Sequence, residues 1–155
     1  MKNTRLAVVF LLLAALAPAS AQNSPEEAKS ADLYEAVVRY QIKTWDLAAN
    51  SYCVSIDGKD AAKDFLARFD PLPVKPASAC RKRTSQKVIM GVVDKKSRKP
   101  AVIFDLESVR WLSSDEAEVV GGYLCGSLCM ASGRYHLIRK DSRWSVTSFL
   151  IQIQS

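Results

Sequence analysis

Two stretches in the second half of the chain decide the fold: residues 101–112 read AVIFDLESVRWL and residues 143–153 read RWSVTSFLIQI. Both alternate between apolar and polar residues, as strands with one buried face do. In the first stretch the apolar residues occupy even positions up to Leu106 and odd positions from Val109 onward, and in the second the phase changes after Val146. An inserted bulge residue switches the phase in this way and bends the strand. We therefore expect two bent strands, although strands buried on both faces would also blur the alternation.

Turn residues separate further alternating segments around the first stretch. The pair Ser132-Gly133 stands where a hairpin connection belongs. The adjacent glycines Gly121 and Gly122 lie inside another segment and favour strong curvature of the sheet. Together these signals predict an antiparallel meander, with strands at residues 87–93, 101–112, 117–125, 134–140 and 143–153.

Helical and short extended segments precede this meander. Apolar residues recur at helical spacing from Leu33 toward Asn50, a short alternating strand follows at residues 51–56, and a second helical pattern covers residues 60–69. The sequence thus predicts one α+β domain over residues 31–155. In this domain, N-terminal helices pack on a strongly curved antiparallel sheet of about five to six strands.

The first 21 residues have the pattern of a signal peptide. Lys2 and Arg5 precede an apolar run at residues 6–16, and small residues end the segment at Ala21. The apolar run is shorter than the roughly 20 residues that a membrane span needs. A polar N-terminal segment then covers residues 22–30. We expect cleavage after Ala21, a periplasmic or secreted protein, and no membrane span in the mature chain.

The mature chain is mildly basic, with 20 Lys and Arg residues against 16 Asp and Glu residues. Much of the excess lies between Arg81 and Lys99, where Asp94 is the only acidic residue. Such a cluster is typical of a solvated face, and it is also a candidate anion-binding surface. The candidate residues are Arg81, Lys82, Arg83, Lys95, Lys96, Arg98 and Lys99. Nucleic acid is not an expected partner, because no aromatic residues are interspersed among these charges.

The four cysteines predict two disulfide bonds in an oxidising compartment. Three pairings are open. We favour Cys53 with Cys80 and Cys125 with Cys129, because each cysteine then pairs with its nearest neighbour in sequence. A metal site is not expected, because the chain has one histidine and a structural zinc site needs four ligands. No cofactor is expected either.

Three residues are candidates for acid–base chemistry. Asp105 and Glu107 are two apart on an expected strand, so both carboxylates share one face. His136 lies between Tyr135 and Leu137. Burial of a carboxyl would raise its pKa toward the range of a general acid. Two solvated carboxylates and a half-buried sheet histidine are the competing interpretations, and no G-x-S-x-G motif supplies a nucleophile.

The aromatic residues admit two interpretations as well, namely a ligand pocket or the core. Core packing is favoured because each falls within an expected helix or strand. The set comprises Tyr34, Tyr40, Trp45, Phe65, Phe69, Trp111, Tyr123 and Trp144.

The layout of helix, short strand, helix and bent meander, closing with YHLIRKDSRWSV at residues 135–146, resembles that of the NTF2-like (SnoaL-like) superfamily. The closing hairpin, with its tyrosine strand, charged turn and Trp-x-Val strand, carries the local part of the resemblance. A cystatin-like layout is the alternative, and the chain also resembles small exported bacterial proteins. NTF2-like domains include isomerases, dehydratases, carriers and inert protein-binding modules, so this resemblance leaves function open.

Two functional hypotheses follow. The first is an exported, soluble, non-catalytic binding or interaction domain, favoured because the sequence has no nucleophile, metal or phosphate-loop motif. Its partner would be an envelope or secreted component or a small apolar ligand, and the sheet offers a face for a homodimer. The second is an NTF2-like pocket enzyme of the isomerase or dehydratase type that uses Asp105, Glu107 or His136 as acid or base. The sequence leans away from an enzyme without deciding the question.

Overall fold

The computed structural model describes residues 25–44 and 49–154. The expected signal peptide at residues 1–21 therefore lies outside the described residues, as does Trp45, whereas Asn50, where the first helix is expected to stop, is described and is not helical.

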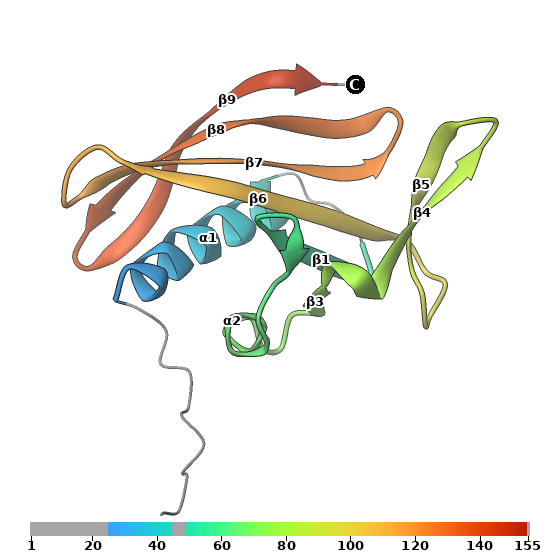
Figure 1. The fold of residues 1–155 in the computed structure, drawn as a ribbon, viewed down its shortest axis with the longest axis horizontal. Coiled ribbons are helices and arrows are strands. Elements are labelled where there is room, and N and C mark those ends of the chain that lie inside the picture. The colour runs from blue at the N-terminus through green and yellow to red at the C-terminus, as the bar shows by residue number, and fades with distance from the viewer. Residues whose placement is uncertain (1–24, 45–48, 155) are drawn as a thin grey trace, which may run out of the picture.

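The main sheet is mixed and has seven strands in the order β2-β1-β6-β7-β8-β9, with β3 pairing beside β1 (Figure 1). Its strands are β1 (Ser51–Ile56), β2 (Lys59–Asp60), β3 (Val74–Pro76), β6 (Ala101–Trp111), β7 (Glu116–Gly126), β8 (Cys129–Lys140) and β9 (Arg143–Gln154). Two further strands form a separate hairpin, β4 (Cys80–Ser85) with β5 (Val88–Asp94). The helices are α1 (Pro25–Thr44), the short α2 (Lys63–Ala67) and the 3-10 turn η1 (Ala77–Ala79).

The expected fold class is wrong in three respects: the number of helices, the number of strands and the strand directions. In place of several helices on an antiparallel sheet of about five to six strands, one long helix packs on a seven-stranded mixed sheet, in which β1 pairs in parallel with both β6 and β3. Parallel neighbours need a long crossover, and here the crossover between β1 and β6 contains α2, β3 and the β4–β5 hairpin. The segment expected at residues 87–93 does not join the meander, because it pairs with β4. The alternation of apolar and polar residues within one strand does not indicate which strand it pairs with, so the sequence could not reveal these pairings.

The two phase changes correspond to bulges, as predicted. The register between β6 and β7 shifts between Leu106 and Val109. Along β9, Val146 pairs with Leu137 and Ser148 pairs with His136, so that the residue between them is extra. These bulges keep apolar side chains on the inner face of the sheet before and after each switch.

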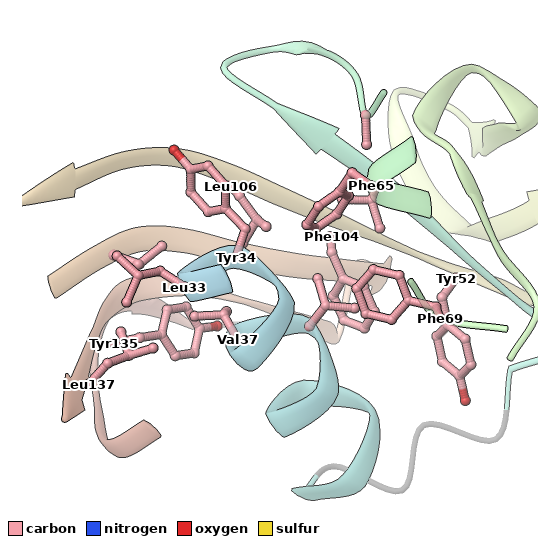
Figure 2. Packing of buried hydrophobic residues seen from close by; sticks show 14 of the residues in the cluster. Leu33, Tyr34, Val37, Tyr52, Phe65, Phe69, Phe104, Leu106, Tyr135 and Leu137 are labelled. Carbon is pink, nitrogen blue, oxygen red and sulfur yellow. The ribbon is translucent and has the colours of Figure 1, made fainter. Parts of the chain in front are cut away.

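The core lies between α1 and the inner face of the sheet. Figure 2 shows Leu33 and Val37 of α1 pointing toward Tyr135 and Leu137 of β8, and all four side chains are fully buried. Burying such a side chain contributes about 1.5–3 kcal/mol before conformational entropy is counted. The same cluster contains Phe65 and Phe69, whose rings meet edge to face, and Tyr52 and Phe104, whose rings stack (Figure 2). Helix α1 thereby fixes the sheet against which the site below is built.

Both expected disulfide pairings are confirmed. Cys53 of β1 is bonded to Cys80 of β4 with Cα atoms 6.1 Å apart, and Cys125 is bonded to Cys129 with Cα atoms 5.2 Å apart. The first bond ties the β4–β5 hairpin to the main sheet, and the second closes the turn between β7 and β8. Two disulfides are compatible with an oxidising extracellular location.

Candidate functional site

A hollow of about 480 Å³ opens at the end of the sheet where the β6–β7 and β8–β9 turns meet the first turns of α1. We call it the two-tryptophan groove. Its lining consists of Lys29, Asp32, Trp111, Ser113, Ser114, Arg139 and Trp144. Its volume lies within the range of about 300–1,000 Å³ that is typical of small-molecule sites.

The two tryptophans form the apolar wall of this groove. Trp111 ends β6 and Trp144 begins β9, and their rings meet edge to face with centroids 5.8 Å apart. Both rings are half-buried and pack against the main core on their inner side. The guanidinium of Arg139 lies 5.6 Å from the Trp144 ring centroid, within cation–π range. The wall therefore combines an indole surface fixed by the core with a cation above it.

The β6–β7 turn forms the polar wall and is held by Arg139. The Arg139 side chain donates to the Asp115 carboxylate at 2.7 Å, and its backbone N–H donates to the Asp115 carbonyl at 2.8 Å. The side-chain hydrogen bond from Arg139 is the main reason that the pKa of Asp115 is lowered. The Ser114 hydroxyl also donates to Asp115, at 2.9 Å. Ser113 and Ser114 are thus presented at the groove by a turn with a fixed conformation.

Helix α1 supplies the third side, with the exposed residues Lys29 and Asp32. Asp32 accepts a hydrogen bond of 2.6 Å from Arg68, which immediately follows α2. The pKa of Arg68 is raised chiefly by this bond. Arg68 also lies 3.3 Å from Glu35, so it connects α2 to one side of α1. The groove lining therefore carries two cations, Lys29 and Arg139, and the carboxylate of Asp32.

The three acid–base candidates lie outside this lining. Asp105 is exposed and accepts a 2.5 Å hydrogen bond from the Ser55 hydroxyl. Glu107 is also exposed. The half-exposed ring of His136 lies between the carboxylate of Glu116, at 2.7 Å, and the hydroxyl of Thr147, at 2.8 Å. The structure brings none of the three candidates to the groove, and each remains a prediction as a catalytic residue.

The basic candidates are gathered in one region, on the β4–β5 hairpin and the turn that follows it. Every one of the seven side chains is exposed. No group of three or more His, Cys, Asp or Glu residues within 25–44 and 49–154 is arranged to hold a metal ion. No helix in those ranges combines the length and the hydropathy that a membrane span requires.

The groove was not located from the sequence, although its two tryptophans belong to the aromatic set for which a ligand pocket was the alternative to the favoured core. A signal was present in their positions. Trp111 is the second-last residue of one expected strand and Trp144 is the second residue of another. Successive strands of an antiparallel meander run in opposite directions. The end of its first long strand and the start of the third strand after it therefore lie at the same end of the sheet. Both rings thus belong at the margin of the core, where one side of each is free to contact a ligand.

Comparison with protein-family models, with curated proteins and with solved structures finds no match to this chain. No family is assigned. The resemblance to NTF2-like domains accordingly stays a prediction, and any function must be argued from the groove and the surface.

Proposed function

We propose that this protein is an exported, non-catalytic binding domain and that the two-tryptophan groove holds its ligand. The observation that carries the proposal is the pair of half-buried indoles, Trp111 and Trp144, beside the Arg139 guanidinium in a hollow of about 480 Å³. Rigid aromatic surface beside a few oriented polar groups is the composition of small-molecule sites. None of the acid–base candidates lines this groove, so binding is better supported than turnover.

The lining favours a ligand with one flat apolar face and several polar groups. Indole rings contact the C–H face of a sugar ring well, and the serine hydroxyls and the Asp32 carboxylate can hydrogen-bond to ligand hydroxyls. Arg139 and Lys29 favour an acidic group at the margin. We therefore propose an acidic sugar-like ligand, which differs from the envelope or secreted partner and the small apolar ligand that are the alternatives expected from the sequence. The predicted signal peptide and the two disulfides support export.

The test is to fill the groove without removing any side chain of the core. Ser114 is exposed, so Ser114→Tyr should place a ring in the hollow and leave the packing of both tryptophans intact. We expect the protein purified from the bacterial periplasm without reductant to carry a small adduct in native mass spectrometry, released by mild activation. The Ser114→Tyr variant should lose this adduct. Titration with glucuronic acid should change the tryptophan fluorescence of the parent protein and not that of the variant.

Ser148→Tyr is the matched control, because Ser148 is an exposed serine on β9 outside the groove lining. It should behave as the parent protein in both measurements. An adduct that survives in Ser114→Tyr would place the ligand elsewhere. The proposal would also fail if the parent protein showed neither an adduct nor a response to glucuronic acid.

A further inference from the structure

The β4–β5 hairpin lies at the end of the molecule opposite the two-tryptophan groove. It projects beside the first residues of β6, whereas the groove lies beyond the last residue of that strand (Figure 1). The hairpin forms its own two-stranded sheet and is held to the main sheet by the Cys53–Cys80 disulfide. Val92 and Cys80 are buried at its base. Val93 and Asp94 are buried there as well, whereas residues 81–88 are all exposed.

This hairpin and the following turn carry a large uncompensated positive charge. Between residues 80 and 100 there are eight basic residues and one acidic residue, Asp94. Asp94 is buried, with 1% of its side chain exposed, and its carboxylate is bound by Lys75 from β3. None of the eight basic side chains forms an ion pair with a residue in the part of the chain that the structure describes. The single acid within residues 80–100 is therefore not available to neutralise the cluster, and Asp60 acts electrostatically on Lys95 alone among these cations.

Apolar side chains are exposed next to these cations. Val88 is 48% exposed and Met90 is 64% exposed, both on β5. Leu128, in the turn between β7 and β8, is 91% exposed. The Ser127 N–H donates to the Ile89 carbonyl at 2.9 Å, so this turn is tied directly to β5. The Cys125–Cys129 disulfide closes the turn, and three exposed apolar residues thus come from two connected segments.

We infer that this basic, apolar-tipped hairpin docks on an anionic lipid surface. Cations attract the headgroups of anionic lipids, and exposed apolar side chains gain from contact with the boundary between headgroups and acyl chains. The charge complementarity is specific to this end of the molecule. A nucleic acid is a poorer fit, because residues 80–94 contain no aromatic side chain on which bases could stack. A soluble polyanion would give the three exposed apolar residues no role.

The test measures how the purified protein partitions onto vesicles of phosphatidylcholine with and without phosphatidylglycerol. We expect cosedimentation with the anionic vesicles only, and release by about 0.5 M NaCl as screening shortens the reach of the charges. Lys82→Glu combined with Lys87→Glu should lower the partition coefficient at least about tenfold. Val88→Ser combined with Met90→Ser should lower it by a similar factor, because both side chains lose their contact with lipid.

Two matched variants separate docking from general effects. Lys140→Glu with Arg143→Glu changes the net charge equally at the groove end, where both residues are exposed, and should leave partitioning unchanged. Leu150→Ser removes a side chain as exposed as Met90, on β9, and should also have no effect. Equal binding to neutral vesicles, or full binding by the Val88→Ser and Met90→Ser variant, would overturn the inference. The inference would also be overturned if the protein bound heparin and not vesicles, and if the Val88→Ser and Met90→Ser variant bound heparin equally well. That result would identify a soluble polyanion as the partner.

Discussion

Asp94 shows how a single buried carboxylate can organise a charged surface. Its Oδ2 accepts from the Lys75 ammonium at 2.5 Å, and its Oδ1 accepts from the backbone N–H groups of Lys96 and Ser97 at 2.9 and 2.7 Å. The hydrogen bond from Lys75, followed by the one from Ser97, holds the pKa of Asp94 far below its usual range. Asp94 thereby fixes the turn that presents several of the basic residues.

The depressed pKa predicts how stability depends on pH. A carboxylate with a lower pKa in the folded state contributes stability above its unfolded pKa, near 3.9, and loses the contribution as the pH falls toward the folded value. Asp94→Asn should therefore lower the free energy of unfolding at pH 7. The difference from the parent protein should shrink between about pH 4 and about pH 2. Urea titrations at pH 7, 4 and 2.5 measure it, with the exposed Asp64→Asn variant as the unaffected control. A difference that stays constant with pH would contradict this account.

A buried contact between Gln41 and Tyr135 is a further feature that the sequence did not reveal. Gln41 has 1% exposure on α1, and its Nε2 donates to the Tyr135 hydroxyl. Its Oε1 is buried and has no hydrogen-bond partner. Rotating the amide would exchange the roles of the two atoms and leave the nitrogen without a partner instead. One buried polar atom is unsatisfied in either case, which costs about 1–3 kcal/mol.

A double-mutant cycle tests this cost. Gln41→Leu alone removes the unsatisfied Oε1 but leaves the Tyr135 hydroxyl buried without a partner, so the two effects offset and the free energy of unfolding should change by less than about 1 kcal/mol. Adding Tyr135→Phe removes the last unsatisfied group, and the double variant should be more stable than the parent protein by about 1–3 kcal/mol. Additive losses from the two changes, measured in urea, would show that the contact is not the source of the effect.

At the scale of elements, local sequence patterns predicted the two bulges. They did not predict which strands pair with one another or in which direction. The phase changes after Leu106 and Val146 are visible in the sequence because a bulge alters the alternation itself. The parallel pairing of β1 with β6 left no such trace, since it depends on how the intervening residues 57–100 return the chain. The strands β2 and β3 contain two and three residues, which is too short for any alternation to be recognised.

Gly133 allows the close approach of β8 to its neighbours. A Cβ atom at this position would collide with the Leu150 carbonyl oxygen and lie 3.0 Å from the Ile151 Cα atom, both on β9. These are backbone atoms of a paired strand and cannot move aside cheaply. Gly133→Ala should therefore lower the free energy of unfolding by about 1–3 kcal/mol. The adjacent Ser132→Ala, at a half-buried position, should change it by less than about 0.5 kcal/mol. Equal stability of the two variants would show that β9 accommodates the added methyl group.

At the scale of the whole molecule, the two proposed sites occupy opposite ends of the β6–β9 meander (Figure 1). The sequence revealed the basic end, because a run of lysines and arginines is visible without a structure. It did not reveal the groove, whose lining comes from α1, the β6–β7 turn and the ends of three strands. Only the pairing of β6 through β9 brings Trp111 next to Trp144.

This separation predicts that a vesicle-bound protein keeps its groove away from the membrane. Phosphatidylglycerol vesicles with brominated acyl chains quench tryptophans that reach the lipid. With Trp45 replaced by phenylalanine, the fluorescence of Trp111 and Trp144 should stay unquenched on these vesicles. Adding Met90→Trp on β5 should introduce a strongly quenched component, because that side chain is 64% exposed at the proposed docking surface. Quenching of the parent tryptophans without the added one would place the groove end on the lipid and reverse the proposed orientation. Ser114→Tyr should leave partitioning unchanged, because ligand binding and docking use opposite ends of the sheet.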